Sequence, residues 1–269
     1  MKLRQVFSYL LLLAIGAVII FPFVWMFLTA LKTPREIFDL SILPQQPTFA
    51  NFREVLFDTR FPRWFGVSTL IASVTTLSVL FFDSLVGYTL AKLRFRGKRI
   101  FFILILSTLM VPTEMLVIPW YVMSAELGWT DSYWGLLFPG IVSAFGVFLM
   151  RQFFETLPND LLDASRLDGV SEFGIFWRIC LPLVRPALAA LGIFTFLTSW
   201  NSFLWPLIIV QSPSMRTIPV GVALFSGEAG SAWHLIMAAS SLSVIPVLIV
   251  FLFFQRQIIE GVVLTGVKG

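Results

Sequence analysis

Thiol and imidazole side chains are nearly absent from this chain of 269 residues, which contains one cysteine and one histidine. A single thiol, that of Cys180, excludes an intrachain disulfide and a metal cluster built on thiolates. The sequence also lacks a Gly-x-x-x-x-Gly-Lys-Ser/Thr nucleotide loop, a Gly-x-Ser-x-Gly nucleophile elbow and paired carboxylates at active-site spacing. We therefore expect neither an enzyme active site nor a metal ion or cofactor bound by this chain.

Charge is scarce as well. Charged residues make up 13% of the chain and hydrophobic residues 58%, and the mean hydropathy is +0.89, so the chain has more apolar surface than a soluble domain can bury. Six stretches nearly free of charge can each supply the roughly 20 residues that a helix needs to cross a hydrocarbon core of about 30 Å. The sequence thus predicts an all-α membrane protein with one transmembrane domain over residues 1–269. Its six spans are expected at about 6–31, 65–91, 100–123, 133–153, 187–210 and 233–255.

The lysines and arginines predict how these spans are oriented. With the N-terminus in the cytoplasm, most basic residues fall on the cytoplasmic side, including five packed between Lys92 and Arg99. Both termini, a loop at 154–186 and a tail at 256–269 would then be cytoplasmic. The net charge of +4 follows from this topology and from contact with anionic lipid, so it gives no reason to expect a nucleic-acid partner.

The loop at 154–186 is the polar, patterned segment of the chain. Asn159, which follows a proline, offers an N-cap to a short amphipathic helix from about Asp160 to Leu167. Gly169 suits a left-handed or close-packed turn, and Ser171 can cap a second short helix. Two later prolines would stop that helix and begin the fifth span. The segment therefore predicts a helix-turn-helix lying on the membrane face.

This loop resembles the coupling loop of permeases in binding-protein-dependent ABC importers. The family pattern is Glu-Ala-Ala, three residues, Gly, nine residues and then Ile-x-Leu-Pro. With every spacing kept, the chain matches it at Ala164, Gly169, Ile179, Leu181 and Pro182. It differs at Asp163, where Glu is usual, and at Ser165, where Ala is usual. The alternative is an ordinary surface helix-turn, which the full motif between the fourth and fifth spans disfavours.

The resemblance implies the type I fold of ABC importer permeases, in the inner membrane of a prokaryotic cell, and a mechanical role for the short helix. This helix would seat in a cleft of a separate ATP-binding subunit. An apolar knob of Leu161, Leu162 and Ala164 would enter the cleft. Asp163 would pair with a base across the interface, and Gly169 would provide a rigid turn. The implied partners are a second permease subunit, two subunits that bind the ATP, and an extracytoplasmic solute-binding protein.

Other segments resemble the second permease subunit of maltose-type sugar importers. They are Arg94-Phe95-Arg96-Gly97, the run from Trp200 to Pro206, Ile218-Pro219-Val220-Gly221 and the tail from Gln255 to Gly269. The resemblance covers essentially the whole chain and implies a mono- or oligosaccharide as solute, with glycerol phosphate or a polyol as the alternative. A stand-alone secondary transporter is a further alternative, but we find no internal repeats of the kind such transporters carry.

Several residues inside the predicted spans are candidates for the translocation pathway. Trp200, Asn201 and Trp205 combine aromatic faces with an amide, as a path for sugars requires, because rings stack on CH-rich faces and amides bind hydroxyl groups. The alternative is that the tryptophans form an interfacial belt and Asn201 ties helices together. Glu114, between two prolines of the third span, is expected to face the subunit interface or the translocation cavity. Asp83 is instead expected near the inner headgroups, paired with a basic residue.

Overall fold

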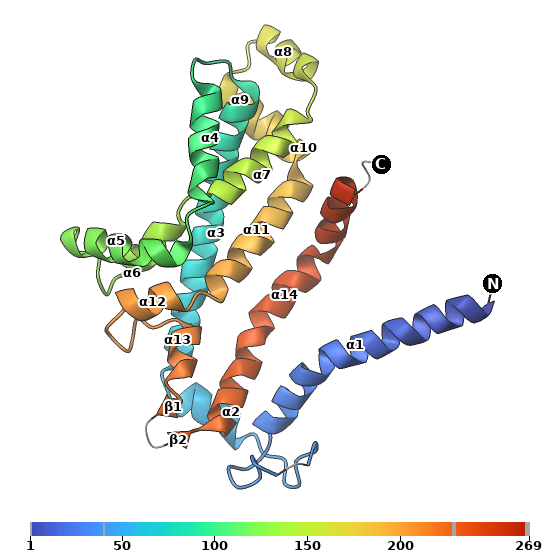
Figure 1. The fold of residues 1–269 in the computed structure, drawn as a ribbon, viewed down its shortest axis with the longest axis vertical. Coiled ribbons are helices and arrows are strands. Elements are labelled where there is room, and N and C mark those ends of the chain that lie inside the picture. The colour runs from blue at the N-terminus through green and yellow to red at the C-terminus, as the bar shows by residue number, and fades with distance from the viewer. Residues whose placement is uncertain (1, 40, 228–229, 267–269) are drawn as a thin grey trace. The chain divides into compact units, whose positions relative to one another are not determined.

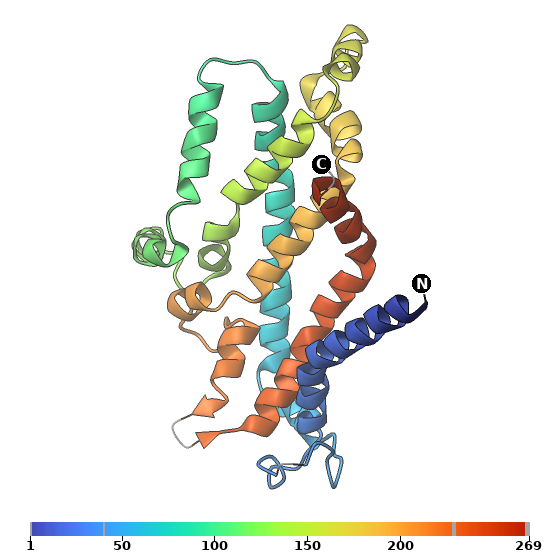
Figure 2. The ribbon, with the colours of Figure 1, turned by 45° about the vertical axis from the view of Figure 1, so that its right-hand side comes forward.

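The computed structural model describes residues 2–39, 41–227 and 230–266, and most of them are helical (Figure 1, Figure 2). The α-helices are α1 (Lys2–Ala30), α2 (Ala50–Arg53), α3 (Phe61–Lys92), α4 (Lys98–Thr108), α5 (Thr113–Glu126), α6 (Tyr133–Leu137), α7 (Ala144–Glu155), α8 (Asn159–Leu167), α9 (Glu172–Ile175), α10 (Leu181–Leu183), α11 (Arg185–Trp200), α12 (Leu204–Ile209), α13 (Ile218–Ala223) and α14 (Trp233–Gly266). Shorter helical segments are the π-helical η1 (Glu54–Asp58) and η3 (Phe176–Cys180) and the 3-10 helix η2 (Phe138–Gly140).

The chain divides into two compact units. One comprises residues 1–65 and 217–247, and the other comprises residues 66–216 and 248–269, so the long helices α3 and α14 each contribute to both. In the first unit a short antiparallel pairing joins β1 (Ser226–Gly227) to β2 (Gly230–Ser231), with Ser226 opposite Ser231. Apart from this pairing, the described part of the chain is built from helices and loops, and the all-α fold class is confirmed.

Three helices are long and apolar enough to cross a membrane without interruption. They are α1 over Gln5–Ala30, α3 over its full length and α14 over Trp233–Phe253. Three further candidates are pairs of helices that meet at a bend, so the described residues supply up to six spans. The apolar window of α1 is 0% buried within this chain, as expected for a surface that faces lipid or another membrane helix.

The third predicted span, 100–123, is broken in the structure. Helices α4 and α5 meet at an angle of 99° (Figure 2). The cause lies in Pro112, which has no N–H to continue the helix and which disfavours helical backbone at the residue before it. Pro112 is extended, with φ −58° and ψ 131°, and α5 begins at the next residue. The run of apolar residues predicted that this segment is helical, but it did not predict the change of direction between α4 and α5.

The fourth and fifth predicted spans are also interrupted. Residues Tyr133–Gly140 and helix α7 form a bend of 45°, at which the Ser143 hydroxyl accepts the N–H of Gly146 at 3.3 Å and caps α7. The fifth span was expected at 187–210, whereas α11 ends at Trp200 and α12 resumes at Leu204 after a three-residue break. Helix α14 continues to Gly266, well past residue 255, and the last three residues of the expected tail lie outside the described residues.

The first unit is held together by polar contacts around the loop between α1 and α2 and by an aromatic contact. The Asn51 amide donates to the carbonyl oxygens of Ala30 at 2.7 Å and of Lys32 at 2.8 Å, which ties α2 to the end of α1. The Lys32 ammonium is buried and donates to the Asp39 carbonyl at 3.1 Å. The ring of Trp64 packs against that of Phe225 with centroids 5.9 Å apart.

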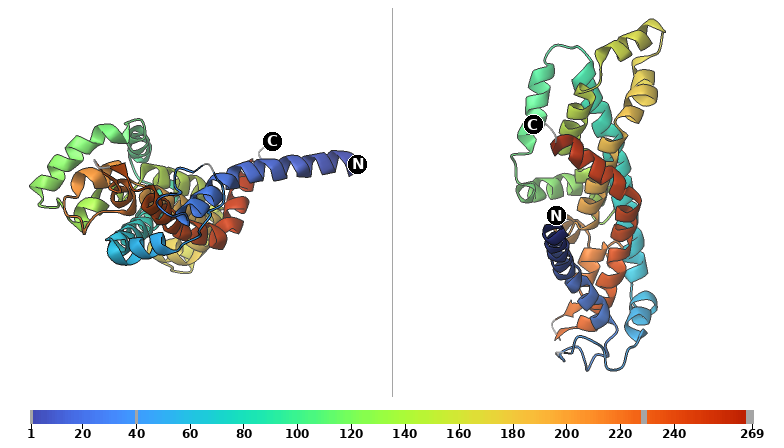
Figure 3. Two further views of the ribbon diagram at one scale, coloured as in Figure 1. Left: turned by 90° about the horizontal axis from the view of Figure 1, so that it is seen from below. Right: turned by 90° about the vertical axis from the view of Figure 1, so that its right-hand side faces the viewer.

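The second unit contains two hydrophobic clusters. One is formed by Val79, Tyr88, Met150, Phe154, Leu162, Ile175, Phe176, Cys180, Val184, Ala187 and Leu191. The other is formed by Val67, Ile71, Val117, Leu136, Leu137, Trp205, Ile209 and Val210. The first cluster therefore joins α3, α7 and α11 to the loop between α7 and α11, and this loop carries α8 at one end of the unit, beside α9 (Figure 3).

Asp83 does not have the basic partner that we expected. It is 0% exposed, and each of its carboxylate oxygens lies 3.1 Å from the backbone nitrogen of Ser143, which donates to it. Ser143 immediately precedes α7, whose N-terminus carries partial positive charge, so this helix end provides the stabilisation that a lysine or arginine was expected to provide. The expectation of a basic partner was wrong because the donor lies 60 residues away in the sequence.

Candidate functional site

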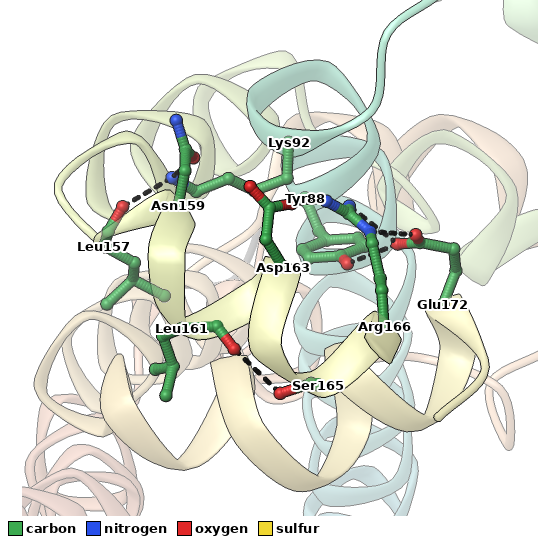
Figure 4. Close-up of polar contacts among 9 residues, drawn as sticks. All are labelled: Tyr88, Lys92, Leu157, Asn159, Leu161, Asp163, Ser165, Arg166 and Glu172. Atoms are coloured by element: carbon green, nitrogen blue, oxygen red, sulfur yellow. Dashed lines mark hydrogen bonds and ion pairs between the residues drawn. The ribbon is translucent and has the colours of Figure 1, made fainter. Parts of the chain in front are cut away.

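Helix α8 begins one residue earlier than the sequence predicts. Pro158 occupies the N-cap position, with extended backbone and no side-chain cap, and Asn159 is the first helical residue. The Asn159 side-chain oxygen accepts instead from the Lys92 ammonium at 2.9 Å, and the same ammonium donates to the Leu157 carbonyl at 2.6 Å (Figure 4). The end of α3 is thereby fixed to the start of α8.

The end of α8 follows the prediction. Gly169 has φ +77°, a left-handed conformation that a residue with a Cβ resists. Its N–H donates to the Arg166 carbonyl at 3.0 Å, and the Val170 N–H donates to the Ser165 carbonyl at 3.1 Å. These two bonds form a Schellman motif, which satisfies carbonyl groups that the last turn would leave unpaired. Gly169 therefore sets the direction in which the chain leaves α8.

The second short helix forms as predicted but does not stop at Pro182. The Ser171 hydroxyl accepts the Gly174 N–H at 3.2 Å and caps α9, which continues through η3 into α10. Pro182 is the second residue of α10, and the helix passes through it and ends at Leu183. The chain then turns by 83° at Val184 before α11.

Helix α8 has an inner face that packs into the protein. Leu162 is only 1% exposed and belongs to the same cluster as Phe154 and Phe176. Ser165 is buried as well, and its hydroxyl donates to the Leu161 carbonyl at 2.8 Å. The motif residues that end the loop also face inward, since partly buried Ile179 and Leu181 pack on this cluster. Leu162 was expected in an apolar knob for a partner, and its burial in the chain's own core corrects that expectation.

The exposed side of α8 carries apolar residues beside the acidic Asp160 and Asp163. Leu161 is 41% exposed, Ala164 is exposed, and Leu167 is 90% exposed. These residues recur every third position, so each neighbours the next and the three form an oblique strip that turns about 120° around the helix. Leu167 was absent from the predicted knob because the sequence interpretation grouped neighbouring apolar residues without separating the two sides. The three-residue spacing from Leu161 to Ala164 indicates Leu167 as the next member of the strip.

Asp163 lies in a polar network within the chain. Its carboxylate accepts from the Arg166 guanidinium at 2.6 Å, and the same guanidinium donates to Glu172 at 2.6 Å and 3.3 Å (Figure 4). Glu172 also accepts from the Tyr88 hydroxyl at 2.9 Å. The hydrogen bond to Glu172, against a smaller effect of desolvation, raises the pKa of Arg166 above its usual value. The network therefore links α8 to α9 and α3, and it leaves the Asp163 side chain largely exposed.

The tryptophans proposed for the pathway are buried. The Trp205 ring nitrogen donates to the Gly135 carbonyl at 2.9 Å, and its ring meets that of Trp120 edge-on with centroids 5.8 Å apart. Trp200 stacks on Phe196 with centroids 5.7 Å apart. Within this chain both tryptophans have structural contacts, which favours the alternative that they pack helices together.

Asn201 and Glu114 are the exposed members of the pathway set. The Asn201 amide donates to the Leu197 carbonyl at 2.9 Å, and its side chain stays at the surface of the chain. Glu114 lies in the first turn of α5, where the positive end of the helix dipole favours a carboxylate. The four candidates thus separate into two buried aromatic residues and two exposed polar ones. Among the residues that the structure describes, no three His, Cys, Asp or Glu side chains gather closely enough to hold a metal ion.

Comparison with known proteins identifies the class. The chain belongs to the family of binding-protein-dependent transport system inner membrane components, which it matches over residues 83–263. It is therefore an integral inner-membrane permease subunit of an ABC importer, as the coupling-loop motif indicated.

Individual relatives show which members of this family the chain resembles. It is 40% identical over 256 residues to the arabinooligosaccharides transport system permease protein AraQ of Bacillus subtilis, a match that covers 93% of this chain and 91% of that protein. It is 34% identical to the sn-glycerol-3-phosphate transport system permease protein UgpE of Pectobacterium atrosepticum, over 96% of each chain. A crystal structure of a bacterial ABC transporter involved in the import of alginate, an acidic polysaccharide, contains a chain with the same fold, with a TM-score of 0.83 at 24% identity over 95% of this chain and 96% of that one.

Proposed function

We propose that this chain is one of two permease subunits in a carbohydrate importer and that α8 receives the movement of an ATP-binding subunit. The observation that carries this proposal is the division of α8 into two faces. Leu162 anchors the inner face in the core, while Leu161, Ala164 and Leu167 present an apolar strip to the outside. A helix that is exposed on one side and rigidly attached on the other can transmit the displacement of a bound partner to the rest of the chain.

The contacts that attach α8 connect this displacement to a membrane-length helix. The Lys92 ammonium joins the start of α8 to the end of α3, and the Arg166–Glu172–Tyr88 network joins its end to the same helix. Because α3 is a membrane-length helix, displacement of α8 would move a span directly. Coupling through α8 therefore needs no flexible linker.

The rest of the assembly is proposed from the topology. Both termini and the 160–182 loop would face the cytoplasm, where two partner subunits bind and hydrolyse ATP. A second permease subunit would complete the translocation pathway, and an extracytoplasmic binding protein would deliver the solute. The exposed apolar surfaces of α1 and α5 would face lipid or the second permease.

An oligosaccharide is the proposed solute. It is supported by the relative named for arabinooligosaccharides, which is 40% identical over nearly the full length of both chains. Glycerol phosphate is the second candidate, supported by the relative named for that compound at 34% identity. Uptake of each solute into proteoliposomes that contain the purified complex, its binding protein and internal ATP would separate the two candidates.

The coupling role is tested by shortening one exposed side chain. Leu167→Ala should lower ATP-driven uptake by at least tenfold while the chain still inserts in the membrane. Leu183→Ala is the matched control, because Leu183 is also exposed but lies on α10. Equal uptake by both variants would contradict the assignment to α8. Solute uptake by the chain alone, with no ATP-binding subunit present, would contradict the importer as a whole.

A further inference from the structure

An open pocket of about 440 Å³ lies beside α8. It is lined by Ala91, Lys92, Leu93, Arg94, Lys98, Asn159, Asp163, Arg166 and Glu172. These residues come from the end of α3, the turn before α4, the start of α4 and the α8–α9 segment. The pocket is therefore formed where the five-residue basic cluster of the sequence meets the candidate coupling element.

The charges that line this pocket do not balance. Four cationic side chains face two carboxylates, and both carboxylates are bound by the same cation, Arg166. Lys92, Arg94 and Lys98 have no ion pair with a carboxylate among the described residues. Glu155, which acts on Lys92 and Lys98 electrostatically, is held by Arg151 at 2.6 Å. The pocket thus presents three cations without an anionic partner.

The two lysines are held in place by uncharged oxygen atoms. Lys98 donates to the carbonyls of Ala91 at 2.9 Å and of Leu93 at 3.2 Å, and Lys92 donates to one carbonyl and one amide oxygen. An ammonium has three donors, so each lysine retains one N–H for a further acceptor. Helices α4 and α8 begin at Lys98 and Asn159, two pocket residues, and their positive ends add to the attraction for an anion.

We propose that this pocket binds a phosphate-bearing anion, with Arg94 and the free N–H groups of Lys92 and Lys98 as its donors. The volume accommodates a phosphate or a glycerophosphate group. Lys92 is the last residue of a membrane-length helix, so the pocket lies where the headgroup of an acidic lipid is available, and with the proposed topology phosphate from the cytoplasm is available there too. The site requires no solute transport and stands apart from the proposed function.

The test measures lipid binding by the purified full-length chain. Native mass spectrometry should detect bound phosphatidylglycerol in preference to phosphatidylcholine. Arg94→Gln should weaken this binding by about tenfold, as expected for a charge-assisted hydrogen bond, and Arg94→Lys should restore part of it. Arg96→Gln is the matched control, since Arg96 belongs to the same basic cluster but does not line the pocket. Arg94 is exposed and outside the helices, so the variants should fold.

The source of the anion is decided by competition with inorganic phosphate. Displacement of phosphatidylglycerol by millimolar phosphate would assign the site to free phosphate as well as lipid, and retention of the lipid would assign it to lipid alone. The proposal is overturned if the wild-type chain binds phosphatidylglycerol no better than phosphatidylcholine. It is equally overturned if Arg94→Gln and Arg96→Gln weaken binding to the same extent, because the attraction would then be a diffuse property of the basic cluster.

Discussion

Asp83 and Ser143 form a contact between a membrane helix and the start of another helix, with both carboxylate oxygens 3.1 Å from one backbone nitrogen. A buried carboxylate needs donors, and the first turn of a helix has N–H groups that lack partners within the helix. The Ser143 N–H therefore satisfies the Asp83 carboxylate, which has no exposed surface, and the carboxylate satisfies that N–H. The contact also fixes how closely α7 can approach α3.

The first prediction concerns Gly146, whose missing side chain makes room for Asp83. A Cβ at this position would lie well inside van der Waals contact with the carboxylate. Gly146→Ala should therefore destabilise the folded protein by about 1–3 kcal/mol, seen as a lower apparent melting temperature in detergent. Gly192→Ala is the control, because its Cβ would meet Leu80 at an ordinary 3.5 Å. Equal melting temperatures of the two variants would contradict the close approach.

The second prediction concerns the turn at Gly169. Proline fixes φ near −65°, whereas Gly169 has φ +77° and donates an N–H to Arg166. Gly169→Pro should uncouple ATP hydrolysis from uptake without preventing insertion, and Asp163→Lys, which places a cation beside Arg166, should do the same. Gly128→Pro is a matched control, since Gly128 has φ +69° and donates to Ala125 at 3.1 Å in a different turn. Wild-type coupling in the Gly169 and Asp163 variants would refute the assigned role.

The third prediction concerns the ion pairs that link α8 to α9. Glu172→Gln removes the charge that Arg166 and Tyr88 share, at an expected cost of about 0.5–1 kcal/mol because the pair is partly exposed. Amide hydrogen exchange in α8 should accelerate accordingly. Glu155→Gln breaks the Arg151 pair within α7 and should leave α8 exchange unchanged. If α8 exchanges at the same rate in both variants, the link does not hold the helix.

The fourth prediction is a pH dependence at Asp131, which has φ +52° between α5 and α6. Its carboxylate accepts from the backbone N–H groups of Gln211 at 3.0 Å and Ser212 at 2.9 Å and from the Ser212 hydroxyl. Partial burial alone would raise the pKa of Asp131, but these hydrogen bonds outweigh it and hold the pKa below the usual 3.8. The stabilisation is therefore complete above pH 3.8 and lost as the pH falls through the lower folded-state value.

Amide exchange at Gln211 and Ser212 measures this dependence. After correction for the intrinsic rate, both amides should be protected at pH 7 and should lose protection only below pH 3.8. Asp131→Asn tolerates the left-handed backbone but lacks the charge, so it should reduce protection at pH 7. Glu126→Gln, a nearby acid at the surface, should leave both amides as in the wild type. Protection that does not change with pH would exclude Asp131 as its source.

The fifth prediction separates packing from transport among the pathway candidates. Trp205→Phe leaves the buried Gly135 carbonyl without its donor and should cost about 1–3 kcal/mol, with less folded protein but normal uptake per folded complex. Asn201→Ala, at an exposed amide, should leave the melting temperature unchanged and lower uptake if Asn201 contacts solute. Reduced uptake per folded complex in Trp205→Phe, together with normal uptake in Asn201→Ala, would instead assign Trp205 to the pathway and exclude Asn201.

Local signals made much of α8 predictable. Gly169 and Ser171 act through their own backbone and near neighbours, and the structure has the turn and the cap that the sequence indicated. The role of Asn159 was not predictable in this way. Its competing partner, Lys92, lies 67 residues earlier, and an ammonium outcompetes a helix N–H for the amide oxygen.

The burial of individual side chains and the angles between helices were harder to predict from the sequence than the helices themselves. Leu161 and Leu162 are adjacent and chemically identical, and only the positions of Phe154 and Phe176 decide which of them is buried. The bend before α5 had a signal in Pro112, but apolar length and composition carry no information on angle. For Asp83, counting residues along α3 could not reveal the helix end that faces the carboxylate.

The hydrogen bonds of Lys92 predict where mutations that suppress a defect in α8 will be found. Because this ammonium joins the Leu157 carbonyl and Asn159 to the last residue of α3, a defect in α8 has two sites at which it can be compensated. Selection for restored growth on the transported solute should then recover second-site suppressors in the turn after Lys92, in addition to those in the gene for the proposed ATP-binding partner.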